Sequence, residues 1–180
     1  MSSLSELTPG TWNIDRTHST VGFMARHLMI TKVRGRFTDL AGAITVASDP
    51  LQSKIEATVQ VNSVSTGDEK RDGHLKSGDF FELEKYPTMT FVSTDIVAKG
   101  GDYALTGDLT VKGITKPVTF DLEFDGVGAD PWGGTRASFS ATTDVLRSDW
   151  GVEFNMVLEA GGVMISDKIQ LTLDIQAVRA

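Results

Sequence analysis

Apolar and polar residues alternate one by one along much of this 180-residue chain, and this period of two is the feature that most constrains its fold. In a β-strand, successive side chains point to opposite faces, so each alternating run predicts a strand with one buried face. Turn signals such as Gly100-Gly101 separate neighbouring runs and predict antiparallel hairpins. The clearest runs, with apolar residues or glycine at every second position, are 55–61, 105–111, 118–124 and 169–175.

About eight strands of this kind are expected, and most are long for a globular sheet. An open sheet would leave the apolar faces in water, so the sheet must curl up or pair with a second sheet. Strands of this length favour a tall barrel over a sandwich. We therefore predict an all-β fold, an extended eight-stranded antiparallel β-barrel. It forms a single domain over residues 11–180, preceded by a flexible N-terminus over 1–10.

Three segments depart from the simple alternation. Phe37 falls at an odd position while Leu40, Ile44 and Val46 fall at even ones, and this slip of phase predicts a bulge that bends the strand. Residues 89–98 alternate too poorly to assign an inward face. Residues 26–34 mix apolar and basic side chains without strict alternation, and we interpret them as a short helical segment between strands.

The stretch from 63 to 91 interrupts the strand pattern and reads as helix. Thr66 and Glu69 have the spacing of a capping box, and Gly78 can take the positive φ that ends a helix. We predict short helical segments within 67–85. Because most connections in compact domains are about 4 to 6 residues long, an excursion of this size predicts a functional element, here a cover over one mouth of the barrel.

Charge and composition exclude several classes of function. The net charge of −7 and the isoelectric point near 4.9 argue against nucleic-acid binding. No run of about 18 apolar residues is present, so no membrane span is expected. The first ten residues lack a basic segment followed by an apolar one, so no signal peptide is visible and a cytoplasmic location is expected.

The inward faces of the predicted strands decide between a filled core and a hollow one. An eight-stranded barrel is just wide enough either to be filled by side chains or to hold one small ligand. Small inward residues such as Gly42, Ala57 and Gly107 stand among large ones, which fits interdigitated packing and a channel equally well. The candidate wall residues are Phe23, Ile44, Val59, Leu105, Leu109, Phe120, Phe124 and Phe139.

Polar candidates are fewer. Arg71 and His74 lie within one helical turn of each other, where they suit either contact with a polar group of a ligand at the barrel mouth or the fastening of a lid. The three histidines, His18, His27 and His74, show no metal-ligand spacing, so we predict no metal and no cofactor. Enzyme motifs such as the nucleophile elbow and the phosphate-binding loop are missing.

Several motifs together resemble the YceI family of lipocalin-like proteins. The similarity begins with Trp12, Asp15 and His18-Ser19, and it is strongest in the segment from Thr66-Gly67 to Asp79-Phe80-Phe81. It continues through 107–118 and Asp149-Trp150-Gly151 and spans Trp12 to about Ala177. The resemblance implies a barrel whose elongated pore binds a polyisoprenoid chain. Family members are often secreted or periplasmic, and this chain differs in lacking a visible signal peptide.

Three functions are consistent with these features. The first is a carrier or store that shields a polyisoprenoid or prenyl-quinone lipid in the barrel. The second is an enzyme that acts on a prenyl or related apolar substrate, with His74 and Arg71 near the reacting end. The third is a dry-cored barrel that acts through its outer surface, for example as a homodimer. The residues favour the carrier, because an apolar channel needs no catalyst to bind a greasy chain.

Overall fold

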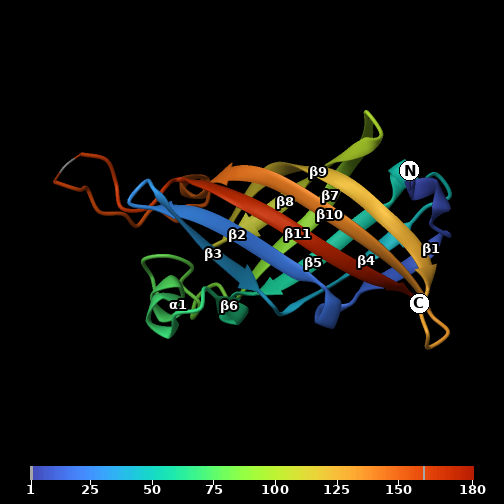
Figure 1. Ribbon diagram of the computed structural model, residues 1–180, viewed down its shortest axis with the longest axis horizontal. Helices are drawn as coiled ribbons and strands as arrows, with labels where there is room; N and C mark the ends of the chain where they lie inside the picture. The colour runs from blue at the N-terminus through green and yellow to red at the C-terminus, as the bar shows by residue number, and fades with distance from the viewer. Residues whose placement is uncertain (1, 160) are drawn as a thin grey trace.

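The computed structural model describes residues 2–159 and 161–180, and Figure 1 shows a long, strongly twisted β-barrel with one short α-helix at its side. The strands are β1 (Gly10–Ile14), β2 (Thr20–His27), β3 (Thr31–Phe37), β4 (Leu40–Val46), β5 (Lys54–Gln60), β6 (Val64–Ser65), β7 (Thr88–Lys99), β8 (Asp102–Val111), β9 (Ile114–Ala129), β10 (Thr135–Leu146) and β11 (Lys168–Arg179). The helix α1 spans Glu69–Leu75, and the 3-10 turns are η1 (Leu4–Glu6), η2 (Arg16–His18), η3 (Pro50–Gln52), η4 (Val61–Ser63) and η5 (Arg147–Trp150).

The eleven strands make up eight barrel strands, because three of the eight consist of two shorter strands that lie end to end. The first pair is β1 and β2, which both pair with β11. The second is β4, which pairs with β1, and β3, which pairs with β2. The third is β5, which pairs with β4, and β6, which pairs with β3. All ladders are antiparallel, and the contact between β1 and β11 closes the sheet. The predicted eight-stranded antiparallel barrel is thus confirmed.

Interruptions of the barrel strands explain where the alternation of apolar and polar residues changes phase. The barrel strand made of β3 and β4 is interrupted between Phe37 and Leu40, where the phase of its apolar residues changes. In β7 the register with β8 shifts between Ser93 and Asp95, so Thr94 is an extra residue. Because one extra residue reverses the facing of all that follow, β7 shows no single alternation along its length.

The prediction of a helical segment near 26–34 is wrong, because these residues form the turn and the adjoining strand ends of the β2–β3 hairpin. Arg26 pairs with Lys32, and His27 pairs with Thr31. Leu28 and Met29 both have positive φ, at 54° and 63°, and the N–H of Ile30 donates to the carbonyl of His27 at 3.2 Å. This tight turn uses bulky residues where glycine or asparagine is usual, so its turn chemistry was invisible in the sequence.

The helix predicted within 67–85 is present but shorter than expected. α1 begins after Asp68, whose side chain accepts the N–H of Arg71 at 3.0 Å, and it ends at Leu75. Thr66 is not the N-cap, because its hydroxyl donates to Asp72 instead, at 2.6 Å. Turns occupy the chain from there to Pro87. None of the helices in the described ranges is long and apolar enough to cross a membrane.

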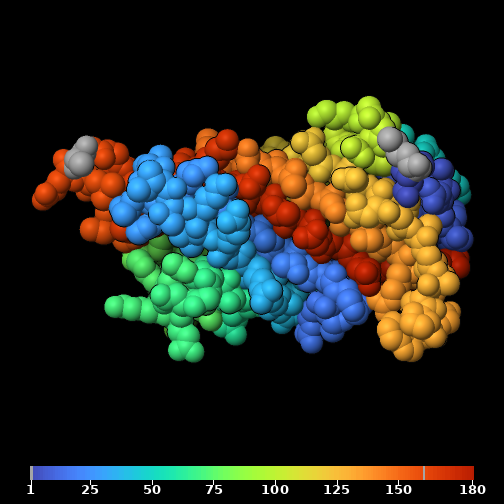
Figure 2. All heavy atoms as spheres, viewed as in Figure 1, coloured from blue at the N-terminus to red at the C-terminus, as the bar shows by residue number. Residues whose placement is uncertain are grey.

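The N-terminal segment packs against the barrel end, in contrast to the flexible segment expected from the sequence. Leu4 and Leu7 are buried, and the N–H of Leu4 donates to the hydroxyl of Tyr103 at 3.0 Å. Figure 2 shows this segment, in dark blue, against the end of the barrel opposite to the hairpin tip. The segment therefore closes one end of the interior.

Candidate functional site

Two adjoining chambers hollow the interior of the barrel. The larger has a volume of about 360 Å³ and lies toward α1 and the β2–β3 hairpin. The smaller, of about 160 Å³, lies toward the N-terminal segment, with Leu4 and Leu7 in its wall. Six residues line both chambers, so the two meet at a shared waist: Val21, Ala57, Val59, Phe91, Leu109 and Leu171.

The polar groups of these walls gather at one end. In the small chamber, Ser53 is the one polar side chain among the lining residues described. The large chamber is apolar near the waist. Its polar lining residues come from the hairpin, the α1 region, η5 and the start of β7: Arg26, His27, Thr66, Arg71, His74, Arg147 and Thr90. The cavity thus has an apolar depth and a polar mouth that carries three arginines, which is the arrangement that suits a ligand with a long apolar tail and a small polar head.

The structure brings most of the predicted wall residues to this cavity. Phe23 lines the large chamber, Val59 and Leu109 line both, and the small chamber takes Ile44, Leu105, Phe120 and Phe139. Phe124 lies outside both chambers, because its ring packs on Phe139 with the ring centroids 5.3 Å apart. We therefore leave Phe124 out of the candidate wall.

Phe91 is a wall residue that the sequence did not reveal, since it lies in the strand with the bulge. A Cβ built on Gly107 would come within 2.3 Å of the Phe91 ring, so this ring occupies the space that a larger residue on the neighbouring strand would fill. Gly35 accommodates the ring of Phe23 in the same way, with a distance of 2.2 Å. Both glycines leave room for a phenyl ring close to the barrel wall, which keeps the cavity open.

The covers of the mouth supply further wall residues. Leu75, Phe80 and Phe81 come from the excursion between β6 and β7, and Trp150 comes from η5. The indole N–H of Trp150 donates to the carbonyl of Leu109 at 2.9 Å, which fixes this ring beside the waist. Sequence patterning missed these residues because turns, unlike strands, carry no period that marks an inward side.

Arg71 and His74 both line the large chamber at its mouth, as a head-group role requires. Arg71 also donates to the hydroxyl of Thr66 at 2.7 Å and to its carbonyl at 2.9 Å, which ties α1 to the residue that follows β6. The Nε2 atom of His74 lies 2.8 Å from Asp79, and its ring meets those of Phe80 and Phe154 edge-on. The geometry thus places two polar groups at the opening and gives both of them a structural contact as well.

Arg147 fastens the second long connection, residues 147–167, to the barrel. Its buried guanidinium donates to the carbonyls of Ser166 at 3.0 Å and Val152 at 2.7 Å. Burial lowers the pKa of this guanidinium, and Asp167 opposes that shift. The side chain therefore serves as a clamp whose donors are directed at backbone carbonyls.

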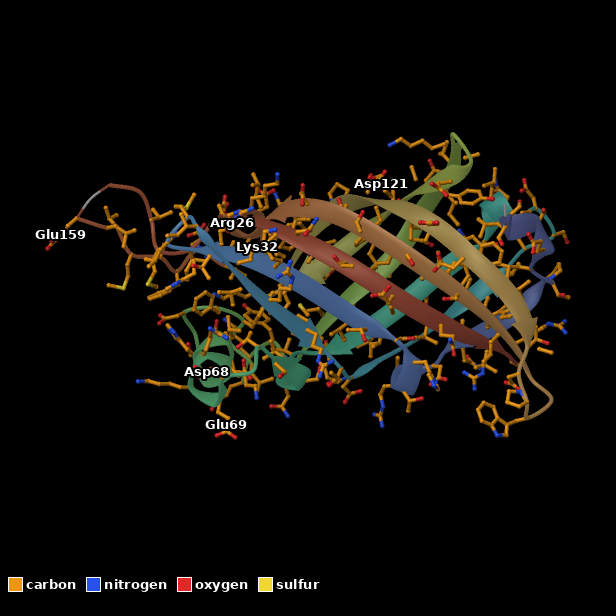
Figure 3. All side chains as sticks on the ribbon, in the orientation of Figure 1. Arg26, Lys32, Asp68, Glu69, Asp121 and Glu159 are labelled. Atoms are coloured by element: carbon orange, nitrogen blue, oxygen red, sulfur yellow. The ribbon has the colours of Figure 1, made fainter. Side chains whose placement is uncertain are left out.

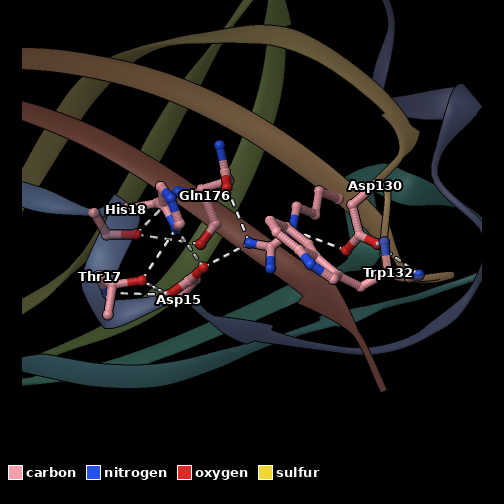
Figure 4. Close-up of polar contacts among 9 residues, drawn as sticks. Asp15, Thr17, His18, Asp130, Trp132 and Gln176 are labelled. Carbon is pink, nitrogen blue, oxygen red and sulfur yellow. Dashed lines mark hydrogen bonds and ion pairs between the residues drawn. The ribbon is translucent and has the colours of Figure 1, made fainter.

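A separate polar cluster lies at the junction of β1 and β2, away from both chambers, and Figure 4 shows its contacts. Asp15 accepts from Arg136, and His18 Nδ1 lies 2.8 Å from the same carboxylate. Arg136 also donates to Asp130 at 2.9 Å, in the β9–β10 turn. Because these residues tie three segments together and line neither chamber, we interpret the cluster as a structural clasp. Within the described residues, no group of three metal-ligating side chains is found.

The clasp predicts a pH-dependent stability. The hydrogen bond from Arg136, with that of His18, holds the pKa of Asp15 well below its usual range. A lowered pKa in the folded state means stabilisation that is complete above the unfolded pKa, about 3.9, and declines as the pH falls below it. Asp15→Asn should therefore destabilise the protein by about 2 kcal/mol at pH 7, and the difference from wild type should shrink below about pH 4. Urea unfolding at pH 7 and in steps below pH 4 measures it.

Asp39→Asn is the matched control, since the Asp39–Arg16 pair is open to solvent, with side chains 45% and 64% exposed. An exposed pair of this kind contributes roughly 0 to 1 kcal/mol. A loss for Asp15→Asn that equals the loss for Asp39→Asn, or that stays constant down to the lowest pH, would contradict the clasp.

Comparison with known proteins gives a consistent family match. The family model of the YceI-like domain matches residues 12–177. The protein YceI of Escherichia coli is 36% identical over 182 aligned residues, which cover 99% of this chain and 92% of that protein.

Solved structures share the fold. The BcnA protein of Burkholderia cenocepacia superposes with a TM-score of 0.79 at 24% identity, over 91% of this chain and 98% of that one. A polyisoprenoid-binding domain from Saccharophagus degradans, implicated in plant cell wall breakdown, superposes with a TM-score of 0.72 at 17% identity, over 94% and 98%. At these identities, the two likenesses establish a common architecture.

Proposed function

This chain belongs to the family of YceI-like domains, and on that premise we propose that its barrel binds one polyisoprenoid or prenyl-quinone lipid as a carrier or store. The tail lies along the two chambers, past the waist at Phe91 and Leu109, and the head group stays at the mouth. The polyisoprenoid-binding domain of Saccharophagus degradans, which has the same fold, supports this class of ligand.

The observation that carries the proposal is the separation of polarity along the cavity. A prenyl tail is entirely apolar, and each Å² of apolar surface removed from water is worth about 25 cal/mol. The small chamber offers almost no hydrogen-bonding partner, so a polar ligand placed there would lose its water without compensation. The mouth, by contrast, offers Arg71, His74 and Arg26 to a phosphate or quinone oxygen.

A titration with two ligands of equal tail length tests this function. Delipidated protein is mixed with a polyprenol or with the corresponding polyprenyl phosphate. Entry is followed by the change in tryptophan fluorescence, because Trp150 is the one of the three tryptophans that lines the large chamber. We expect saturable binding of both ligands at one per chain. Because Arg71 can donate two hydrogen bonds to a phosphate, Arg71→Gln should weaken the phosphate about ten-fold and leave the polyprenol unchanged.

Lys70→Gln is the matched control, because Lys70 is the neighbouring exposed cation of α1 and does not line either chamber. Thermal unfolding of both variants checks that α1 stays in place after Arg71 loses its bonds to Thr66. The absence of saturable binding for either ligand would refute the carrier. Equal losses for both ligands in Arg71→Gln would place the head group elsewhere.

A further inference from the structure

We propose that the mouth of the barrel docks onto an anionic lipid bilayer, with the β2–β3 hairpin tip as the inserting element. This surface adjoins the mouth of the cavity and shares Arg26 and His27 with its lining, but binding to vesicles is measured with delipidated protein. Failure of the docking proposal is therefore distinguishable from failure of the carrier proposal.

Exposed apolar side chains are concentrated at this end of the molecule. The hairpin tip presents Leu28, Met29 and Ile30 to solvent, and Ile30 is 76% exposed. The adjoining loop, residues 152–167, adds Met156 and Val157, of which Val157 is 84% exposed. Five of the ten large exposed apolar side chains of the described chain thus belong to two neighbouring tips. Exposed apolar surface gathered in this way marks a contact with a membrane or a partner.

The two tips are held side by side at the opening of the large chamber. The N–H of Leu28 donates to the carbonyl of Met164 at 2.7 Å, and His27 forms a bridge with Ile165. Figures 1 and 2 show the hairpin and the loop projecting together beyond the same end of the barrel. His27, Met164 and Ile165 also line the large chamber, so the apolar tips continue the cavity wall outward.

The outer face of the hairpin carries a cationic stripe, formed by Arg26, Lys32, Arg34 and Arg36. Arg26 and Lys32 lie directly opposite each other in the ladder, and Figure 3 shows them together on the hairpin. Residues 32, 34 and 36 share one face of β3, since facing alternates along a strand. All four side chains are exposed, and none is in an ion pair within the described ranges.

This stripe identifies the occupant. Like charges directly across a ladder destabilise a hairpin, and here they occur in a chain whose net charge is −7. An anionic surface would compensate them, and the apolar tip beside them selects a bilayer over an acidic protein or a polyanion. Apolar residues flanked by Lys and Arg form the usual interfacial membrane anchor.

Vesicle co-sedimentation tests the docking. The full chain is mixed with vesicles of phosphatidylcholine alone or with added phosphatidylglycerol, and we expect binding to the anionic vesicles that weakens as salt is raised. Lys32→Gln with Arg34→Gln should lower the partition coefficient about 25-fold, because each basic residue contributes roughly five-fold. Lys54→Gln with Lys99→Gln removes two exposed cations far from the mouth and should leave most of the binding intact.

The apolar contribution has its own variant, Leu28→Asn with Met29→Gly. Asparagine and glycine suit the positive φ of the turn better than leucine and methionine do, so the melting temperature of this variant should be no lower than that of wild type. Its binding to anionic vesicles should nevertheless be about ten-fold weaker. Glu159, which Figure 3 shows at the far end of the adjoining loop, opposes docking, so Glu159→Gln should raise binding about five-fold.

Two results would overturn the proposal. The first is equal sedimentation of wild type with neutral and anionic vesicles at low salt. The second is unchanged vesicle binding by Leu28→Asn with Met29→Gly, together with equally strong binding of wild type to soluble heparin. That combination would make the stripe a site for an acidic macromolecule instead of a bilayer.

Discussion

Replacing Leu109 by tryptophan is expected to empty the barrel of lipid while leaving it folded. Leu109 lines both chambers and faces Phe91 across the ladder, so a larger ring at this position fills the waist through which the tail must pass. In a tightly packed core the same change would force neighbours apart at a cost of about 1 to 3 kcal/mol. Here the indole enters existing space, and we expect a smaller change in the free energy of unfolding.

Leu146→Trp supplies the control for this experiment. Leu146 ends β10 and is 47% exposed, so the same chemical change there adds a ring to the outside of the barrel. We expect Leu146→Trp to retain lipid like the wild type, as measured by mass spectrometry of an organic extract. Full retention of lipid by Leu109→Trp would contradict the tail path. A loss of stability of several kcal/mol would instead indicate a filled core.

Replacing Arg147 by methionine is expected to cost about 3 kcal/mol of stability. The substitution leaves the buried carbonyls of Val152 and Ser166 without their donor, and each unsatisfied buried acceptor costs roughly 1 to 3 kcal/mol. Removal of the buried charge returns part of this energy, because its desolvation is no longer needed. Urea unfolding should show a lower midpoint with an unchanged slope.

Arg16→Met is the control for Arg147, since Arg16 is 64% exposed and contacts Asp39 in solvent. We expect it to change stability by less than about 1 kcal/mol. Arg147→Met should also shorten the residence time of bound lipid, because the loosened connection contributes Val152 and Ile165 to the chamber wall. An effect of Arg147→Met no larger than that of Arg16→Met would contradict the clamp.

The barrel itself was predictable from sequence because most of its strands show the alternation of apolar and polar residues within their own length. Leu105, Leu109 and Phe120 fall on one phase of long alternating runs, and a period of two leaves a single choice of inward face. The change of phase between Phe37 and Leu40 was also visible, but it predicts a bulge within one strand, whereas β3 ends at Phe37 and a separate strand, β4, begins at Leu40. The excursion after β6 was recognisable as a cover by its length and its capping residues, although Asp68 and not Thr66 caps the helix.

The features that escaped prediction depend on tertiary contacts. The turn at Leu28 and Met29 uses bulky residues at positive φ, and its link to Met164 joins segments more than a hundred residues apart. Phe91 reaches the waist because Gly107 on another strand leaves room for its ring. The phase of the alternation identified the inward face of the regular strands. Whether those faces enclose a cavity depends on how all eight barrel strands meet the β6–β7 excursion and the connection over 147–167.

Native mass spectrometry of the purified protein tests the central claim most directly. If the barrel holds a lipid along its two chambers, the wild-type spectrum should contain a species heavier than the bare chain by the mass of one lipid. Activation in the gas phase should release that mass, and Leu109→Trp should lack it. A wild-type spectrum that shows the bare chain alone, together with no uptake of polyprenol by delipidated protein, would contradict the account.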